Sequence, residues 1–370
     1  MKEAKALIAW CAFSLLTAAA LVSITPTAAA QGDSGAVYVL TNQHANSVLV
    51  YARADDGALT LSGSFLTGGM GAGTGGDPLG SQGSLVLGSM HQLLFAVNAG
   101  SNDVSVFRVS GLSLQLMDRV LSGGTMPVSL AVKGSLLYVL NAGGTPNIQG
   151  FLVNPCGHLV HLAGSGRPLA GGDGSAPAQV SFTPDGDVLM VTEKNTNQID
   201  TWTVDDEGFA QDRTVTNSSG GTPFGFAFAD RDFAIVSEAE PSALSSYAVG
   251  DNGHLILITG TLSDGQKANC WVVVTKNRRY AFTTNTGSGN ISSYLVSQDG
   301  SLTLLDAVAA NTGTGTAPID MALSDDSRFL YVREATKSVV EGFRVESNGN
   351  LIPVNSAPGV PAGAQGVAAR

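Results

Sequence analysis

The sequence is poor in charged residues, in aromatic residues and in cysteine. Only 13% of its 370 residues are charged and 6% are aromatic, and acidic residues outnumber basic ones by 30 to 19. A formal net charge of −11 excludes the basic surface that binds nucleic acid, so no nucleic-acid partner is expected. Apart from Cys11 near the N-terminus, the cysteines are Cys156 and Cys270. These two fall on different units of the repeat described below, so no disulfide is expected.

Several catalytic and cofactor motifs are missing as well. There is no Gly-x-Ser-x-Gly segment, no phosphate-binding lysine motif and no His/Cys spacing for a metal. A Ser-His-Asp hydrolase and a zinc enzyme are therefore disfavoured, and no cofactor is expected. Gly71, Gly73 and Gly76 match the dinucleotide-binding fingerprint formally. Residues 84–88 continue as a strand, whereas that fingerprint needs a helix, so the match is rejected.

What the sequence does contain is glycine, 46 residues of it, and a repeated strand pattern. Residues 94–109 form the clearest copy. An apolar run ends at Asn98, a polar turn follows, and a second run alternates apolar residues with Ser105 and Arg108. This alternation with a period of two predicts a strand hairpin. No stretch after residue 31 has the apolar spacing of an amphipathic helix.

Seven copies of this pattern align on the residue that closes the first apolar run. Successive copies are 43 to 56 residues apart, near the roughly 40 to 50 residues of a four-stranded propeller blade. Tight turns such as Asp299-Gly300 and Gly-x-x-Pro segments such as residues 174–177 recur at fixed places. The seven closing residues are Asn42, Asn98, Asn141, Glu193, Glu238, Asn285 and Glu334.

The repeat predicts an all-β fold, a single seven-bladed β-propeller of four-stranded antiparallel blades. One blade cannot bury both faces of its own sheet, so the blades must stack in a ring. The chain begins with three strands of a blade, and residues 359–369 resemble a lone innermost strand. The C-terminal strand is therefore expected to close the ring against the N-terminal blade.

The N-terminus predicts export. Charged residues at 1–5, an apolar run over 6–22 and small residues at 27–30 are typical of a secretory signal peptide. The expected organisation is a signal peptide at 1–30 and a propeller domain at 31–370, with the mature protein secreted or periplasmic and without stable membrane insertion. An uncleaved membrane anchor is the alternative, for which the apolar run is slightly short.

Propeller geometry brings the closing residues and the Gly-x-x-Pro loops to one face, around the central channel. Three carboxylates and four amides there can bind a polar ligand or a cation, or orient a water for general-base attack. Alternatively, these side chains only cap the hairpin turns of their own blades. An insertion at residues 67–80 lies on the same face, and we expect a lid over the channel or a linker.

The motifs at residues 137–141, 183–186, 192–194 and 329–332 make the whole mature chain resemble the seven-bladed β-propeller lactonase family. That family includes propeller-type 6-phosphogluconolactonases and the fungal carboxymuconate lactonizing enzyme. Its active members carry Glu, Arg and His beside the inner strands. The resemblance places the family Glu at Glu193. The Pro-Arg-His positions correspond to Pro177, Ala178 and Gln179, a further His falls near residues 126–128, and a later Pro-Arg falls on Pro318 and Ile319.

The resemblance implies a lactone hydrolase, a carboxylic ester hydrolase, or a related cycloisomerase that acts at the channel mouth, and the predicted signal peptide implies that it is exported. Its substrate would be a lactone or a sugar-like ligand other than 6-phosphogluconolactone, and Glu193 would be the general base. The alternative is a non-catalytic propeller that presents one face to a surface sugar, a cation or a protein partner. A monomer is expected in either case. The residues expected to bind the substrate are Asn98, Asn141, Gln179, Glu238, Asn285 and Glu334.

Overall fold

The computed structural model describes residues 35–73, 75–88, 92–230 and 232–370. The predicted signal peptide at residues 1–30 lies outside the described residues. Everything below concerns the unit that runs from Ser34 to Arg370.

Seven antiparallel sheets make up the fold, and each sheet runs from an innermost strand to an outermost one. In blade order, the innermost strands are β29 (Val367–Ala369), β4 (Leu85–Leu87), β8 (Thr125–Lys133), β13 (Pro177–Phe182), β17 (Pro223–Asp230), β21 (Asn269–Val274) and β25 (Pro318–Leu323). The second strands are β1 (Ala36–Leu40), β5 (Leu93–Asn98), β9 (Leu136–Gly143), β14 (Val188–Glu193), β18 (Phe233–Glu238), β22 (Tyr280–Asn285) and β26 (Phe329–Glu334).

The third strands are β2 (Ser47–Arg53), β6 (Asp103–Ser110), β10 (Asn147–Val153), β15 (Gln198–Val204), β19 (Ala243–Val249), β23 (Asn290–Val296) and β27 (Val339–Val345). The outer strands are β3 (Leu59–Leu66), β7 (Ser113–Leu121), β11 (Leu159–His161) with β12 (Arg167–Pro168), β16 (Ala210–Asn217), β20 (Leu255–Ser263), β24 (Leu302–Asn311) and β28 (Leu351–Pro358). One short 3-10 helix, η2 (Gly172–Gly174), precedes β13.

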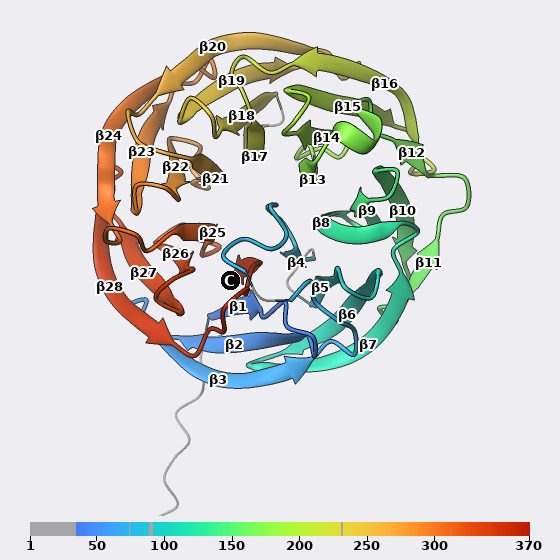
Figure 1. Ribbon diagram of the computed structural model, residues 1–370, viewed down its shortest axis with the longest axis horizontal. Coiled ribbons are helices and arrows are strands. Elements are labelled where there is room, and N and C mark those ends of the chain that lie inside the picture. The colour runs from blue at the N-terminus through green and yellow to red at the C-terminus, as the bar shows by residue number, and fades with distance from the viewer. Residues whose placement is uncertain (1–34, 74, 89–91, 231) are drawn as a thin grey trace, which may run out of the picture. The chain divides into compact units, whose positions relative to one another are not determined.

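The sheets stand side by side as the blades of a ring (Figure 1), which confirms the predicted seven-bladed propeller. Burial explains the strand patterns. Every residue of β14 is buried, because neighbouring blades cover both faces of a second strand. The outer strand β16 of the same blade alternates between exposed and less exposed residues. Inner strands therefore read as apolar runs, and outer strands keep an alternating pattern.

The C-terminal strand closes the ring, as predicted. Val37 pairs with Ala369 and Val39 with Val367 in an antiparallel register between β1 and β29. The backbone N–H of Gln365 donates to the Leu40 carbonyl at 3.0 Å and extends this seam. Blade 1 is thus built from both ends of the described chain.

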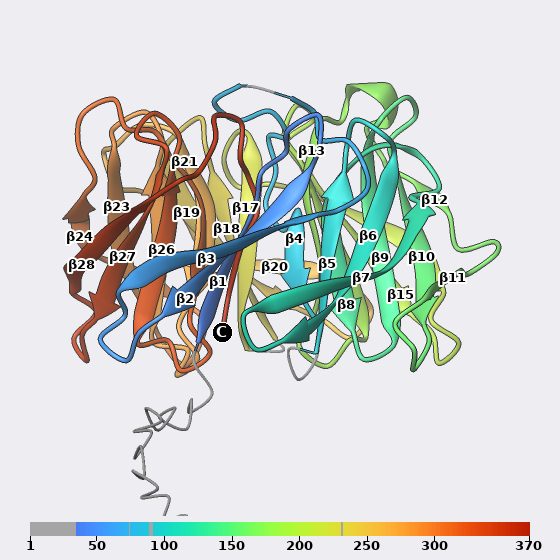
Figure 2. The same cartoon turned by 90° about the horizontal axis from the view of Figure 1, so that it is seen from below.

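The two faces of the ring differ in the connections they carry (Figure 2). One face carries the segments that enter each blade at its innermost strand, together with the turns between second and third strands. We call it the loop face. The other carries the short turns between first and second strands and between third and fourth strands, and we call it the turn face.

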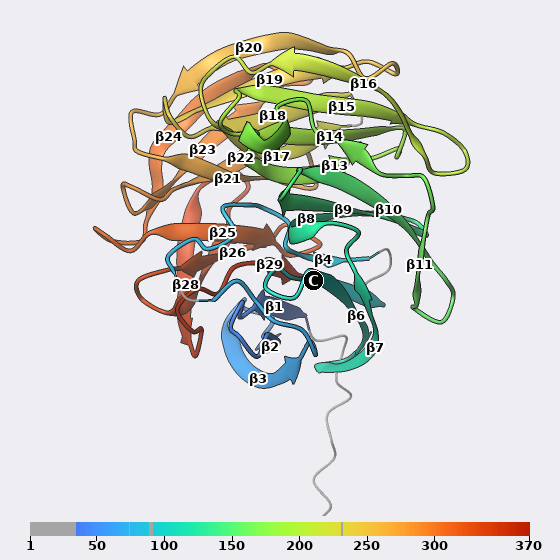
Figure 3. The ribbon, with the colours of Figure 1, turned by 45° about the vertical axis from the view of Figure 1, so that its right-hand side comes forward.

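The insertion at residues 67–80 lies on the loop face, where Lys194 of blade 4 binds the Gly80 carbonyl (Figure 2). The residues that follow it, 81–83, run into the middle of the ring (Figures 1 and 3). The Ser81 hydroxyl donates to the Val128 carbonyl of β8 at 2.8 Å. The Gln82 amide donates to the Val272 carbonyl of β21 at 2.8 Å and accepts the Val272 N–H at 3.1 Å. Gly225 approaches Gln82 so closely that a Cβ at this position would collide with the Gln82 amide oxygen. Residues 79–83 therefore cross-link blades 3 and 6 through the axis of the ring.

Removing the closing strand should destabilise the protein. Truncation after Gly359 deletes β29, leaves the inner edge of β1 unpaired and exposes Val37 and Val39, which have no exposed surface in the ring. Burial and lost hydrogen bonds together predict a loss of at least about 3 kcal/mol of unfolding free energy. Urea unfolding of the truncated and the full-length protein measures it. Equal midpoints for the two would refute the role of the closure.

Candidate functional site

The seven closing residues are fully buried, each with 0% exposure. They do not line the channel. Each lies at or just beyond the end of the second strand of its blade, beneath the loop face. This burial leaves no surface through which a substrate could contact them in the present conformation.

Most closing residues hold the segment that enters their own blade. The Asn98 Oδ1 accepts a hydrogen bond from the Thr67 hydroxyl at 2.7 Å. The Asn141 Nδ2 donates to the Ser122 carbonyl at 3.3 Å. The remaining residues that bind such a segment are Asn42, which donates to the Gly363 carbonyl, Glu193, which accepts from Gly171, and Glu238, which accepts from Gly220. The backbone groups that these side chains bind therefore belong to the incoming segment and not to the hairpin turn of the blade.

Blades 6 and 7 depart from this arrangement. Asn285 donates to Asn290 and Ser292 of its own blade at 2.8 and 2.7 Å. Both carboxylate oxygens of Glu334 are buried without a hydrogen-bond partner among the described residues. Burial raises the pKa of Glu334 to about 7, and the nearby charge of Glu341 raises it further. Glu334 is therefore partly protonated at neutral pH.

Glycine is needed where the incoming segment touches the closing side chain. A Cβ on Gly171 would collide with the Glu193 carboxylate, and one on Gly220 would collide with the Glu238 carboxylate. The same close approach recurs at Gly69 of blade 2. Glycine is therefore required at these positions for close contact with a side chain.

Glu193 shares its surroundings with a second buried carboxyl group. The Gly171 N–H donates to both Glu193 oxygens at 3.1 and 3.0 Å, and the Thr196 hydroxyl donates to Oε2 at 2.5 Å. Asp200 is fully buried and accepts the Ala170 N–H at 2.8 Å. Burial raises the pKa of Asp200 to about 7, and the nearby Glu193 charge adds to the rise. Near neutral pH, a proton on Asp200 relieves the repulsion between the two carboxylates.

Gln179, which was expected to bind substrate, is engaged with the neighbouring blade. Its amide donates to the Phe226 carbonyl at 3.0 Å and accepts the Phe226 N–H at 2.7 Å. Its exposure is 7%. This pair joins β13 to β17 near the axis.

The mouth of the ring on the loop face carries a charged pair that the sequence reading did not identify as a site. The Gly80 N–H donates to the Asp77 carboxylate at 2.9 Å, and the Lys194 ammonium donates to the Gly80 carbonyl. Lys194 also lies over the Phe224 ring, 5.0 Å from its centroid. The backbone of one residue thus holds an acid and a base close together. We call Asp77, Gly80, Lys194 and Phe224 the mouth cluster.

Solvent reaches this cluster although protein surrounds it. Asp77 is exposed and Lys194 is partly exposed. Desolvation nevertheless raises the pKa of Asp77 and lowers the pKa of Lys194, and each charge partly offsets the shift of the other. Both properties are expected of side chains in a recess, and a recess is where perturbed acids and bases are most useful.

Two further charged residues adjoin the mouth cluster but are buried. The Arg333 Nη2 donates to the Pro361 carbonyl at 3.1 Å, and its Nε and Nη1 have no partner among the described residues. Burial lowers the pKa of Arg333 to about 10, so the guanidinium stays charged at neutral pH. Burial raises the pKa of Asp320 to about 7. The charges of Asp77 and Asp320 both act on Arg333.

The sequence alone already places these basic residues next to the closing residues, where they could neutralise the carboxylates. Lys194 follows the closing residue Glu193, and Arg333 precedes Glu334. Adjacent side chains on a strand point to opposite sides of the sheet, so the neighbour of a closing residue points away from the side on which the closing side chain is buried. The positions that carry Arg and His in the family hold Ala178 and Gln179 here. Lys194 and Arg333 instead come from the ends of second strands.

Two further findings concern metal binding and membrane spans in the described ranges. No group of three or more His, Cys, Asp and Glu side chains in those ranges is arranged to hold a metal ion. No helix among the same residues is long and apolar enough to span a membrane.

The buried carboxyl pair predicts a pH-dependent stability. Asp200 binds its proton more tightly in the folded state than in the unfolded one, so stability falls as pH rises from about 4 to about 7. Asp200→Asn keeps the protonated shape but cannot ionise. The unfolding free energy of the variant, relative to that of the wild type, should rise by up to about 1.4 kcal/mol per pH unit in this range. Urea unfolding at pH 5 and pH 7 measures this, with the surface-turn variant Asp185→Asn as control. Parallel pH profiles of wild type and Asp200→Asn would contradict it.

Comparison with protein-family models gives a match to one family, "Lactonase, 7-bladed beta-propeller", over residues 75–234 and 228–320. A comparison with curated protein sequences gives no match.

Solved structures with the same fold include the following three. The periplasmic gluconolactonase of Pseudomonas aeruginosa is 16% identical, with 90% of this chain and 98% of that chain covered and a TM-score of 0.71. A candidate 6-phosphogluconolactonase from Bacteroides fragilis is 15% identical, with 92% and 99% covered and a TM-score of 0.68. A protein from Lactobacillus plantarum is 18% identical, with 91% and 99% covered and a TM-score of 0.72. At these identities the likeness concerns the fold.

Proposed function

The chain belongs to the seven-bladed β-propeller lactonase family, and we propose on this basis that it hydrolyses a lactone to the corresponding hydroxy acid at the mouth cluster. The observation that carries the location is the Asp77 and Lys194 pair on the backbone of Gly80. Hydrolysis of an ester needs a base for water and a positive group for the developing oxyanion. These two side chains provide both, and solvent reaches both.

Each residue has a defined role in this proposal. Asp77 takes a proton from a water molecule whose oxygen attacks the lactone carbonyl carbon. Lys194 stabilises the oxyanion of the tetrahedral intermediate. The ring C–O bond then breaks, and Asp77 returns the proton to the leaving alkoxide. The raised pKa of Asp77 suits a group that must both accept and donate this proton.

The substrate class follows from charge. The mouth cluster has one acid and one base, and the chain as a whole carries a net charge of −11. Such a field disfavours a strongly anionic phosphorylated lactone. We propose a neutral sugar lactone, met outside the cytoplasm after the segment at residues 1–30 has directed export. The periplasmic gluconolactonase among the similar folds is compatible with this assignment.

The catalytic role of Glu193 stays a prediction. Its oxygens are bonded to the Gly171 N–H and the Thr196 hydroxyl, so it could act as a base only if residues 170–172 moved. In the present conformation it positions the segment beside Lys194. The substrate-binding roles of the other closing residues and of Gln179 likewise stay predictions.

Turnover of D-glucono-δ-lactone above the spontaneous rate, followed as acid release with a pH indicator, tests the proposal. Asp77→Asn and Lys194→Met should each lower kcat/KM by about 10²- to 10³-fold, because each removes a group that acts in the transition state. Lys267→Met, which removes an exposed lysine from the segment entering blade 6, should leave turnover unchanged. No turnover by a folded protein would overturn the proposal.

A matched pair of variants separates the two roles of Glu193. Glu193→Gln and Glu238→Gln change equivalent buried residues that hold equivalent segments. If Glu193 only positions its segment, the two variants lose similar stability and Glu193→Gln keeps most of the turnover. Complete loss of turnover in Glu193→Gln alone, with Asp77→Asn still active, would make Glu193 the base.

A further inference from the structure

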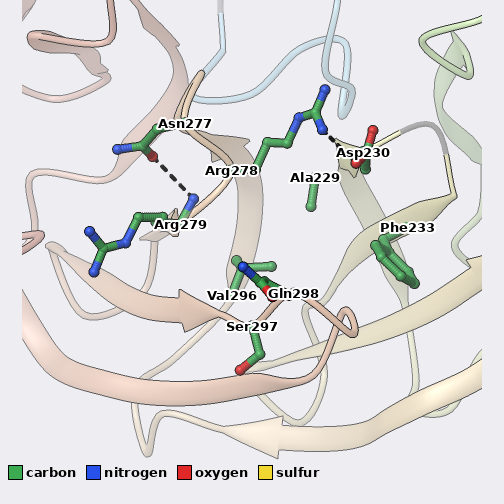
Figure 4. A pocket seen from close by; sticks show the side chains of 9 residues that line it. All are labelled: Ala229, Asp230, Phe233, Asn277, Arg278, Arg279, Val296, Ser297 and Gln298. Carbon is green, nitrogen blue, oxygen red and sulfur yellow. Dashed lines mark hydrogen bonds and ion pairs between the residues drawn. The ribbon is translucent and has the colours of Figure 1, made fainter.

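A pocket of about 450 Å³ opens between blades 5 and 6 on the turn face of the ring. Figure 4 shows the Arg278 side chain reaching Asp230 on one side, with Val296 and Gln298 on the other. The residues that line it are Ala229, Asp230, Phe233, Asn277, Arg278, Arg279, Val296, Ser297 and Gln298. It lies on the face opposite to the mouth cluster, so its chemistry is separate from the proposed reaction.

The repeat supplies two equivalent hollows for comparison. One, between blades 4 and 5, has a volume of only about 10 Å³ and is lined by several aspartates. The other, between blades 6 and 7, has about 260 Å³ and carries Asp326 and Glu346 at two of its turns. The pocket between blades 5 and 6 has Asn277 and Ser297 at those same turn positions. Both carboxylates have thus been replaced by neutral hydrogen-bonding side chains.

This replacement leaves a surplus of positive charge. Between blades 6 and 7, Arg328 lies 3.9 Å from Asp326. Its counterpart Arg279 has no carboxylate partner among the described residues, and its guanidinium lies 5.5 Å from the centroid of the Tyr280 ring. Arg278 is paired with Asp230 at 2.5 Å. One of the two guanidinium groups, that of Arg279, therefore lacks a carboxylate partner among the described residues, in a chain that is acidic overall.

The remaining lining suits a polar molecule with a carbon skeleton. The Ser297 hydroxyl, the Gln298 amide and the Asn277 Nδ2 make no hydrogen bond within the described part of the chain. Ala229 and Val296 form an apolar floor with exposures of 4% and 5%. A cavity of this volume is in the usual range for small-ligand sites.

We propose that this pocket binds a small hydroxylated carboxylate, a sugar acid. Arg279, which stands exposed at the rim (Figure 4), turns to the ligand carboxylate together with Arg278. The unpaired donors of Ser297, Gln298 and Asn277 bind its hydroxyl groups. The carbon skeleton lies against the apolar floor. Arginine suits this role because its planar fork matches a carboxylate.

Calorimetric titration of the protein with D-gluconate, D-glucose and inorganic phosphate tests the chemistry of the ligand. Gluconate should bind at least about tenfold more tightly than glucose, because charge-assisted hydrogen bonds are the stronger ones. Gluconate should also bind more tightly than phosphate, which cannot use the apolar floor. Equal binding of gluconate and glucose, or of gluconate and phosphate, would overturn the proposal, as would the absence of binding.

Three variants test the location. Arg279→Gln should weaken gluconate binding about tenfold or more, whereas Arg328→Gln, the same change in the neighbouring hollow, should leave it unchanged. Both arginines are exposed, so neither change threatens the fold. Lys194→Met should also leave this affinity unchanged, which separates the pocket from the mouth cluster. Equal weakening by Arg279→Gln and Arg328→Gln would refute the assignment.

Discussion

The hydrogen bonds between a closing residue and the segment entering its blade are the contacts on which the loop face depends. Asn98, Glu193 and Glu238 each end a second strand and bind the chain that has just arrived from the preceding blade. Because these side chains point beneath the loops, the residue that follows a closing residue in the sequence can point in another direction. In blade 4 that residue is Lys194, which reaches the axis and binds the Gly80 carbonyl. A structural contact repeated around the ring therefore determines where Lys194 stands at the mouth.

An acid pair distinguishes blade 4 from blades 2 and 5. In blade 2 the closing amide of Asn98 bonds the Ser105 hydroxyl at 2.8 Å, and in blade 5 the Glu238 carboxylate accepts from Ser245 at 2.7 Å. Blade 4 has Asp200 in the corresponding place, and burial raises its pKa to about 7. A second ionised carboxyl group there would repel Glu193, which holds the segment beside Lys194.

The fold could be predicted because it is encoded locally and repeatedly. The alternation around Asn98, the spacing of seven copies and the lone strand at the C-terminus each report on short segments, and β29 pairs with β1 as expected. The site could not be predicted to the same extent. Position along a strand does not reveal which loop covers a side chain, so the burial of Glu193 beneath Gly171 was not foreseen.

The mouth cluster was missed for a related reason. Asp77 and Gly80 lie in an insertion that belongs to no repeat, and its neighbours Ser81 and Gln82 find their partners on blades 3 and 6. Contacts between residues so far apart in the sequence leave no local pattern. The resemblance to the family pointed to positions near Ala178 and Gln179, whereas Lys194 and Arg333, the cations near the mouth, stand at the ends of second strands.

A crystal structure of the protein with a lactam analogue of the sugar lactone would test the central claim most directly. The lactam keeps the ring and the carbonyl group but resists hydrolysis. The account predicts that it binds at the mouth of the ring, with its carbonyl oxygen within hydrogen-bond distance of Lys194 and a water between its carbonyl carbon and Asp77. A lactam bound elsewhere in an active protein, in particular between blades 5 and 6, would contradict the claim that the reaction takes place on the loop face.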